Sequence, residues 1–376
     1  MRRIPRNSFL NQGNTELEKS TVIVSNHLAG HRIQYLVSFL NRSSESNKRI
    51  VLVLISKIEF GLSELQIRAL QELDFEFIDD CKNSSEALDT AQLMATQFHR
   101  SEILFWDADN WILPLLVFRP KSRLLFMRPY LSNKSLKKVS LFLLKWSAIF
   151  FFHFIRGFDV RILGVPCHTP KLLPSLWVDD ALLISPDGFT AASESNGTKM
   201  LFAIPQNSQV VLVPGFMGLR KNPRLVIEAI EIVSKSIIGD ACLIFAGKSD
   251  LESSNIINNF GNTNIKHIDR YLSDAEYRQL LLVADVVILS YTNKGSSGII
   301  IESLAYGKHV IISDSRLWTG ATEKANGLLH PCKFNAASIA DVIVQILSEK
   351  GSIPPVILAG MTRPTVIDFF QGSSGR

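Results

Sequence analysis

With 376 residues, 46% of them hydrophobic, the chain can bury two cores, so we expect two domains of about 150–200 residues each. The formal net charge of +5 is small and evenly spread, which argues against nucleic-acid binding and suits an anionic ligand or an anionic membrane surface. The four cysteines have no metal-ligand spacing and the polar N-terminus has no secretory signal, so we expect a reduced, cytoplasmic protein without a metal site.

In the first half of the chain, short apolar segments rich in β-branched residues alternate with segments of helical periodicity. The predicted strands have the sequences STVIVSN, RIVLVLIS, FEFID, EILFWD, RLLFMRP and DVRILG. Helical patterns such as GHRIQYLVSFLN and SSEALDTAQLMATQFH separate them. This alternation predicts βαβ units and a parallel sheet.

One segment of the first half, Val139–Ile155, is nearly apolar for 17 residues. On a helical wheel the basic residues in and around it fall within about 40° of one another. These residues are Lys134, Lys138, Lys145 and Arg156. Three interpretations are open: a core helix, a helix lying on an anionic membrane surface, and a transmembrane helix. The last is disfavoured because the segment is short and contains a lysine and a histidine.

After a polar segment, DGFTAASESNGTK, the alternation restarts with the strands QVVLVP, ACLIFAG, IKHI, VVILS and HVIIS. We therefore expect an α/β fold with two Rossmann-like, doubly wound parallel-sheet domains facing across a cleft. The domains would span 1–198 and 199–376, and the last helix is free to pack back on the first domain. Neither half contains G-x-G-x-x-G or G-x-x-x-x-G-K-[ST], which argues against a dinucleotide dehydrogenase and a P-loop enzyme.

A glutamate stands within the apolar stretch SSGIIIESLAYGKHVIIS, residues 296–313. The pattern predicts a helix from Gly298 to Tyr306, with a serine as N-cap and a glycine as C-terminal stop, followed by a buried strand. The first-turn N–H groups of such a helix form an anion site. Glu302 lies about one turn further along, and by itself it would be interpreted as a solvent-facing side chain.

Five segments of the second half occur in a distinctive order between 210 and 347. They are VVLVPGFMGLRKNPRLVIEAIEIV, DACLIFAGKSD, IKHIDRYLSDAEYRQLLLVADVVILS, GSSGIIIESLAYGKHVIIS and ANGLLHP. In this order and spacing they resemble glycosyltransferase family 4, the glycosyl transferases group 1. The resemblance implies a GT-B fold, a nucleoside diphosphate sugar as donor, retention of anomeric configuration, and no metal or other cofactor.

The resemblance also implies a donor site in the second domain. Lys221, with Arg220 beside it, would bind the diphosphate together with the N–H groups at the start of the Gly298 helix, because developing phosphate charge needs cations and helix N-termini. Glu302 would bind the ribose hydroxyls, and Tyr271 would lie near the base. The implied donor-binding residues are Lys221, Arg220, Ser297, Gly298, Ile299, Glu302, Tyr271 and Lys294.

Three positions depart from the family's pattern. Lys294 stands where the family has the first of two glutamates, the one that usually handles the sugar. Phe216 replaces a common arginine, and Arg128 stands where the family often has a histidine. These departures support an alternative, a catalytically silent GT-B protein that binds nucleotide or acts as a scaffold subunit. A sugar-nucleotide epimerase of the same fold has no positive support.

Candidate residues of the first domain follow its predicted strands. Gly30 and His31 follow the first strand, where the family has a glycine-bearing loop for phosphate or acceptor. Asp107 and Asp109 follow the strand EILFWD, where side chains of a binding site collect. A carboxylate there could hold or deprotonate an acceptor hydroxyl, or it could cap the loop. Two aspartates without a third ligand do not predict a metal site.

Together these observations predict a retaining glycosyltransferase of polysaccharide biosynthesis. The acceptor would be a surface glycan or a lipid-linked saccharide. The protein would work in the cytoplasm, at the face of an anionic membrane contacted through 134–156.

Overall fold

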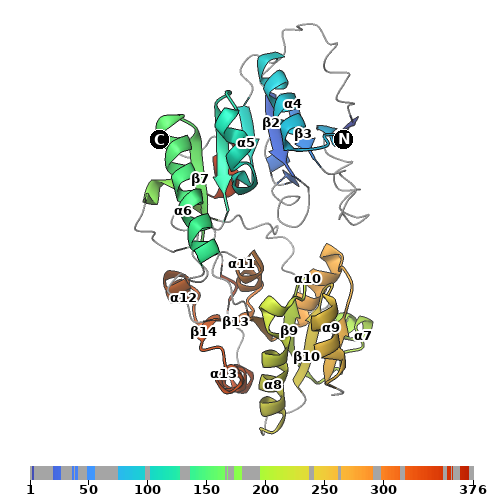
Figure 1. Ribbon diagram of the computed structural model, residues 1–376. Coiled ribbons are helices and arrows are strands. Elements are labelled where there is room, and N and C mark those ends of the chain that lie inside the picture. The colour runs from blue at the N-terminus through green and yellow to red at the C-terminus, as the bar shows by residue number, and fades with distance from the viewer. Residues whose placement is uncertain are drawn as a thin grey trace. The chain divides into compact units, whose positions relative to one another are not determined.

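The computed structural model divides the chain into two compact units, each with its own parallel sheet (Figure 1). Unit 1 comprises Met1–Gly164, Pro170–Leu183 and Arg363–Arg376, and unit 2 comprises Val165–Thr169 and Ile184–Thr362. The residues described are 2–3, 20–26, 36–37, 39–40, 49–55, 75–97, 102–127, 136–165, 167, 173–179, 195–236, 241–260, 264–290, 298–313, 318–349, 354–356, 358 and 365–371.

The sheet of unit 1 has the strand order β1-β4-β3-β2-β5-β6-β7-β8, and all neighbours are parallel. The strands are β1 (Arg2–Arg3), β2 (Ser20–Ser25), β3 (Arg49–Leu54), β4 (Glu76–Ile78), β5 (Glu102–Phe105), β6 (Ser122–Phe126), β7 (Asp159–Gly164) and β8 (Trp177–Asp179). The order reverses at β2, which pairs with both β3 and β5, as in a doubly wound sheet.

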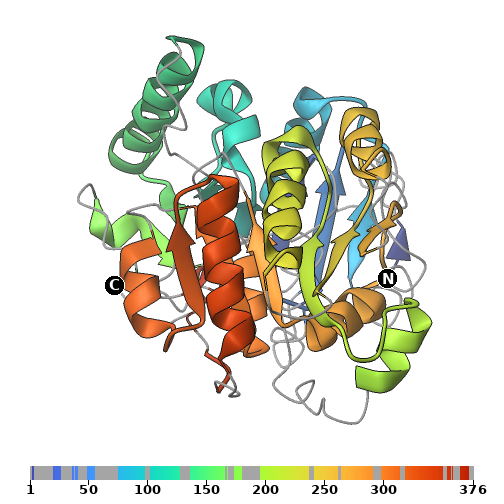
Figure 2. The same ribbon diagram turned by 90° about the horizontal axis from the view of Figure 1, so that it is seen from below.

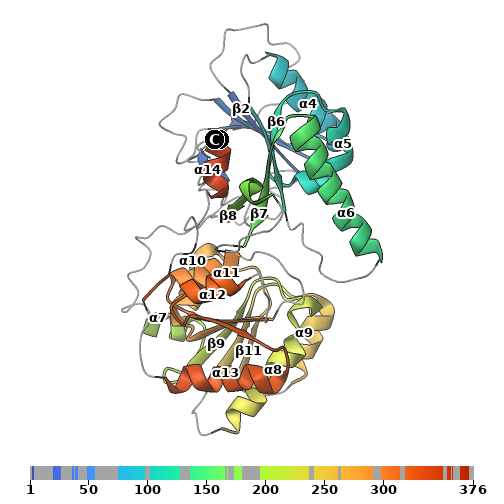
Figure 3. The same ribbon diagram turned by 90° about the vertical axis from the view of Figure 1, so that its left-hand side faces the viewer.

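Helices cover both faces of this sheet (Figure 3). On one face lie α4 (Ser84–Gln97), α5 (Ile112–Val117) and α6 (Leu136–Phe150), and α6 continues into a π-helical turn, η2 (Phe151–Ile155). On the other face lies α14 (Val366–Gln371), whose Phe369 and Phe370 join the core formed by Ile23, Leu52 and Leu104. Short 3₁₀ turns η1 (Ala108–Asn110) and η3 (Pro174–Leu176) follow β5 and precede β8.

The apolar segment 139–155 is helical, as predicted, but its basic side faces the unit. Ala148, Ile149 and Phe152 are buried in the core between the sheet and the helices. Lys145 and Arg156, which lie on the same side of the helix as Ile149 and Phe152, bond to groups of unit 1. Among the described residues, the predicted basic stripe is therefore not exposed, and none of the described helices is long and apolar enough to span a bilayer.

The sheet of unit 2 has the order β11-β10-β9-β12-β13-β14, again with parallel neighbours. The strands are β9 (Gln209–Pro214), β10 (Ala241–Ala246), β11 (Ile265–Ile268), β12 (Val286–Leu289), β13 (His309–Ser313) and β14 (Leu329–Cys332). The order reverses at β9, and ligands of doubly wound sheets bind beyond the carboxyl ends of the strands at such a point.

The helices of unit 2 are α7 (Ser195–Leu201), α8 (Pro223–Ser234), α9 (Leu251–Asn258), α10 (Asp274–Val283), α11 (Gly298–Ala305), α12 (Thr319–Lys324) and α13 (Ala336–Ser348). Helices α8 and α13 lie side by side on one face of the sheet (Figure 2). Helices α10 and α11 lie on the other face (Figure 3). Helix α11 ends in a turn at Gly307, whose φ is +66°, so the predicted helix, its glycine stop and the strand after it are confirmed.

Candidate functional site

Lys221 lies in the short 3₁₀ turn η5 (Leu219–Lys221), between β9 and α8, and its side chain is buried. Its Nζ donates a hydrogen bond to the carbonyl oxygen of Pro214, the last residue of β9. Its own carbonyl oxygen accepts a hydrogen bond from Oγ of Ser290, just beyond β12. The end of β9 therefore holds the amine of Lys221, and Ser290 beyond β12 holds its backbone, at the point where the strand order reverses.

The amine of Lys221 gives up its proton more easily than an ordinary lysine does. Burial, and to a smaller extent the positive charge of the neighbouring Arg220, lowers the pKa of Lys221 to about 7. An ammonium with little solvent gains more from an anionic ligand than an exposed one does. The exposed Arg220 beside it adds a second positive charge to the same loop.

Glycine is required at the end of β9 because three elements meet there. Gly215 has a φ of +85°, and a Cβ on it would lie 3.2 Å from Nζ of Lys221 and 3.2 Å from Cδ1 of Ile299. A Cβ on Gly247, after β10, would lie 2.5 Å from the carbonyl oxygen of Gly215. The loops after β9 and β10 and the first turn of α11 are thus in contact, and Lys221 and Ile299 lie on either side of bare backbone.

Glu302 lies on the less buried side of α11. The buried side is formed by Ile300, Ile301 and Leu304, whereas Gly298, Ile299 and Glu302 are half-buried. Residues three and four positions apart share a helix face, so Glu302 is on the face that begins with Gly298 and Ile299. Helix α11 is therefore apolar where it packs against the sheet, and its one carboxylate, Glu302, lies on the same side as its first residues.

Tyr271 follows β11, in the turn before α10, and 79% of its surface is exposed. Arg270 pairs with Glu276 at 2.6 Å, and Glu276 forms a capping box with Ser273 at the start of α10. These bonds hold the pKa of Glu276 near 2. The same bonds fix the turn, and the aromatic ring of Tyr271 is exposed on it.

Two aspartates that sequence reasoning did not identify hold the loops of this region together. Asp250 caps α9 through the N–H of Ser253 and also accepts a hydrogen bond from the N–H of Leu219 in η5. Asp269 accepts from the N–H of Ser249 and pairs with Lys248 at 3.1 Å. Hydrogen bonds lower the pKa of both carboxyls. The spacing of Asp250 and Ser253, an N-cap pattern, is the one signal that could have indicated this role.

In unit 1, Asp107 and Asp109 lie beyond the carboxyl ends of β5 and β6. Asp107 is buried and accepts hydrogen bonds from Nδ2 of Asn110 at 3.0 Å and Nε1 of Trp111 at 3.4 Å, so it fastens the turn after β5. Asp109 accepts from the N–H of Met127 and pairs with Nζ of Lys145 at 2.7 Å. Burial raises the pKa of Asp109 and the charge of Lys145 opposes the rise.

Several predicted site residues fall outside the described residues: Gly30, His31, Lys294 and Ser297. The others divide between the two units. Lys221 and Ile299 lie together, Glu302 shares the helix face of Ile299, and Tyr271 lies two strands away at the same edge of the sheet. Among the described residues, no three His, Cys, Asp or Glu side chains are grouped so that they could hold a metal ion.

The comparisons with known proteins agree with the motif-based resemblance. The family model described as glycosyl transferases group 1 matches residues 201–354, which confirms that resemblance and contains Lys221, Tyr271, Glu302 and the glycine loops. A search of curated proteins finds no match to the chain.

Solved structures share the fold over most of the chain. A glycosyltransferase from Rickettsia africae has a TM-score of 0.64 at 15% identity, covering 88% of both chains. Anabaena HepE in complex with UDP and glucose has a TM-score of 0.62 at 14% identity, covering 88% of this chain and 90% of its own. A putative UDP-N-acetylglucosamine 2-epimerase from Listeria monocytogenes has a TM-score of 0.55 at 11% identity, covering 90% and 92%. The fold is therefore GT-B, with two Rossmann-like domains.

Proposed function

We propose that the protein is a glycosyltransferase that moves a sugar from a nucleoside diphosphate donor to an acceptor. One observation carries the proposal: Lys221, the bare backbone at Gly215 and the first turn of α11 converge beyond β9, where the strand order reverses. The match of unit 2 to the glycosyl transferases group 1 supports it, as does UDP in the complex of the structurally similar HepE.

Each group of the site has a chemical task in this proposal. The diphosphate lies against Gly215 and the first-turn N–H groups of α11 from Gly298 and Ile299, with Ser297 extending the cradle. Lys221 and Arg220 stabilise the charge that develops on the leaving nucleoside diphosphate. Such cations act without a metal ion, in line with a metal-independent transfer.

The remaining donor contacts orient the nucleoside and the sugar. Glu302 accepts hydrogen bonds from the ribose hydroxyls, and Tyr271 lies against the base, since an exposed aromatic ring on a fixed turn can stack on a nucleobase. Lys294 is assigned to the sugar. Transfer with retention of anomeric configuration is part of the proposal, based on the family resemblance.

The acceptor is assigned to unit 1, where Asp107 and Asp109 follow β5 and Gly30 and His31 follow β2. Asp109 is the better candidate for handling an acceptor hydroxyl, because its side chain is 10% exposed whereas Asp107 is buried in its own turn. The proposed acceptor is a surface glycan or a lipid-linked saccharide at the cytoplasmic face of a membrane. Peripheral contact through 134–156 belongs to this proposal.

Calorimetric titration with UDP, GDP and ADP tests the donor site. Glu302→Ala should weaken binding of the preferred nucleotide by about 1–3 kcal/mol, the value of charge-assisted hydrogen bonds to the ribose. Glu228→Ala, an exposed glutamate on α8 at the opposite face of the sheet, is the matched control and should bind as the wild type does. Equal affinity of Glu302→Ala and the wild type for every nucleotide would refute the assignment.

A second candidate function is a silent GT-B protein that binds nucleotide without turnover. The observation in its favour is Phe216, an exposed phenylalanine directly after Gly215, at a position where the family commonly has an arginine. Incubation with nucleotide sugars separates the candidates. Transfer or slow hydrolysis indicates the transferase, conversion of the donor to its epimer indicates an epimerase, and an unchanged but bound donor indicates the silent protein.

A further inference from the structure

Among the described residues of unit 1, the exposed large hydrophobic side chains lie on two neighbouring helices. Within the described residues of this unit there are nine of them, three on α5 and six on α6–η2. We call these nine side chains the α5–α6 surface. Scattered apolar side chains are normal on protein surfaces, but a contiguous apolar patch marks an interaction site.

Helix α6–η2 supplies the longer part of this surface. Leu143, Phe150 and Phe154 follow one another at helical spacing, and the rings of Phe150 and Phe154 stack with centroids 5.5 Å apart. The charged side chain within the helix lies elsewhere: Lys145 pairs with Asp109 and also donates to the carbonyl oxygen of Met127. The exposed side of the helix also includes Ser140 and Ser147, but among described residues it carries no charged side chain.

Helix α5 continues the surface past the end of η2. Arg156 bonds to the carbonyl oxygens of Leu116 and Phe118, which brings the end of η2 against the end of α5. Ile155 is 73% exposed and Val117 is 79% exposed. The two helices thus present one apolar surface, joined by the half-buried guanidinium of Arg156.

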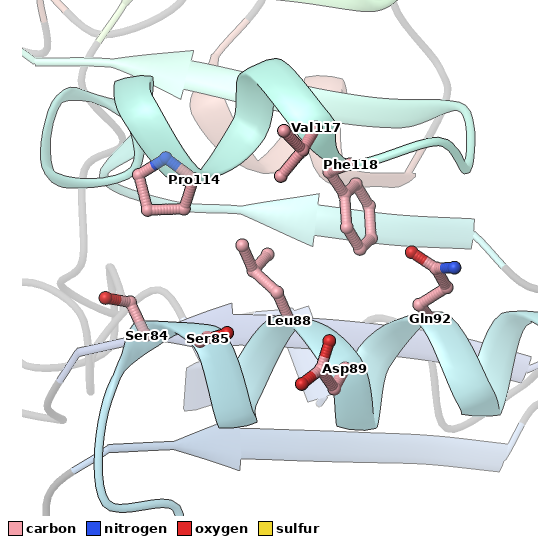
Figure 4. A pocket seen from close by; sticks show the side chains of 8 residues that line it. All are labelled: Ser84, Ser85, Leu88, Asp89, Gln92, Pro114, Val117 and Phe118. Carbon is pink, nitrogen blue, oxygen red and sulfur yellow. The ribbon is translucent and has the colours of Figure 1, made fainter.

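A groove between α4 and α5 borders this surface (Figure 4). Val117 lines both, and Leu88 of α4 points across the groove toward α5. On the α4 side the lining becomes polar, with Asp89 and Gln92. The exposed acidic side chain of Asp89 marks the limit of the apolar surface.

The sequence that forms the surface is basic. From 110 to 158 it contains nine basic residues and no acidic residue. Two of the basic residues, Arg119 and Lys121, are exposed directly after α5, whereas the exposed acidic side chain of Asp89 lies across the groove on α4. An apolar helix face next to exposed cations matches an anionic lipid surface, whose headgroups attract the cations while the acyl boundary takes up the apolar side chains.

We propose that the α5–α6 surface inserts into the boundary of an anionic phospholipid bilayer. The contact is made by leucine, phenylalanine, isoleucine and valine side chains, because Lys145 and Arg156 bond to groups of unit 1. Helix α5, which no sequence pattern assigned to a membrane, supplies three of the nine side chains. This inference rests on the peripheral contact in the proposed function and replaces its basic stripe by an apolar surface, and it does not depend on which donor unit 2 binds.

Flotation of the full-length protein with vesicles tests it, using phosphatidylcholine alone or mixed with phosphatidylglycerol. The wild type should bind the mixed vesicles and stay bound in about 1 M NaCl, where screening acts within about 3 Å. The double variant Leu143→Glu, Phe154→Glu should bind about tenfold or more weakly. Leu251→Glu, an exposed leucine of unit 2, is the control and should bind like the wild type.

Three results would overturn the proposal. Complete release of the wild type by salt would indicate purely electrostatic binding, and equal binding by the double variant would exclude the α5–α6 surface. If the wild type is a dimer that does not bind vesicles and the double variant is a monomer, a second copy of the chain covers the surface. UDP binding is measured on every protein, so a wild type without it would contradict the proposed function and leave this inference intact.

Discussion

Lys221 is the residue whose chemistry most depends on its burial. Its pKa of about 7 means that the amine is partly neutral at physiological pH in the free protein. A diphosphate next to it favours the ammonium form, so donor binding should take up a proton. This coupling would make the positive charge appear when the phosphate arrives, and it links donor affinity to pH.

We therefore predict that nucleotide affinity falls as the pH rises above about 7, by up to about tenfold per unit. The physical reason is that binding then requires protonation of an amine that is neutral in the free protein. Titration calorimetry between about pH 7 and 9, in buffers of different ionisation enthalpy, measures both the affinity and the proton uptake. Lys221→Met keeps the buried volume and should bind weakly with little pH dependence. A wild-type affinity that is constant across this range would contradict the mechanism.

The same pKa shift has a consequence for stability. The unfolded chain, with an ordinary lysine pKa, binds the proton that the folded protein releases, so the free energy of unfolding should rise with pH between about 7 and 10. Urea denaturation of the wild type and of Lys221→Met, compared across this window, measures the contribution. The sign is opposite to that of nucleotide affinity, which separates the two effects.

Asp109 and Lys145 form the corresponding ion pair of unit 1, with side chains 10% and 26% exposed. Lys145→Met should destabilise the protein by about 3 kcal/mol at neutral pH, because it leaves a buried carboxylate without its cation. Burial raises the pKa of the Asp109 carboxyl, so the contribution of this group to the free energy of unfolding falls as the pH rises through its folded pKa. The penalty should therefore shrink at acidic pH, below this raised pKa, because a protonated carboxyl needs no cation.

The double variant Asp109→Asn, Lys145→Met is the control for this prediction. It replaces the charge at both positions, so it should recover much of the stability lost in Lys145→Met. Urea denaturation at the two pH values provides the measurement. A penalty that is the same at both values and that persists in the double variant would show that Lys145 acts through packing alone.

At the scale of elements, the helices and strands of unit 2 are easier to predict from the sequence than the contacts between its loops. The predicted helix at Gly298 and the strand at His309 are confirmed because capping residues, a glycine stop and a β-branched run are local signals. The bonds of Asp250 and Asp269 to loops of other strands were not predictable. They depend on which strand ends become neighbours, and that follows from the strand order.

Helix α6 shows where a helical wheel stops being informative. The wheel correctly grouped Lys145 and Arg156 on one side, but apolar residues surround that side, so periodicity could not tell inside from outside. The basic side faces inward because its bonding partners are there: Asp109 and the carbonyl oxygens at the end of α5 come from other elements. A buried cation needs such partners, and they are visible only in the folded unit.

At the scale of the whole molecule, the chain returns to unit 1 at its C-terminal end. Arg123 of β6 donates hydrogen bonds to the carbonyl oxygens of Phe369 and Phe370 at 3.0 and 3.1 Å. The ring of Phe370 packs on Trp106 with centroids 5.6 Å apart. The core of unit 1 is therefore completed only after all of unit 2 has been synthesised, and contacts of such long sequence separation form slowly.

We predict that Phe370→Ala destabilises unit 1 by about 3–5 kcal/mol, the cost of removing a fully buried phenylalanine from a core. Unit 2 contains its own sheet and core, and the core cluster that includes Phe370 belongs to unit 1, so nucleotide binding at Lys221 should persist in the variant under native conditions. Urea denaturation followed by tryptophan fluorescence reports mainly on unit 1, because four of the five tryptophans lie there and only Trp318 lies in unit 2. Tyr271→Ala, which removes an exposed aromatic ring, is the control and should change stability by less than about 0.5 kcal/mol.

If Phe370→Ala unfolds at the wild-type urea concentration, the return of α14 contributes nothing to the core. If it abolishes nucleotide binding while unit 1 stays folded, the two units are energetically coupled, and the description of unit 2 as an independent donor-binding module is wrong.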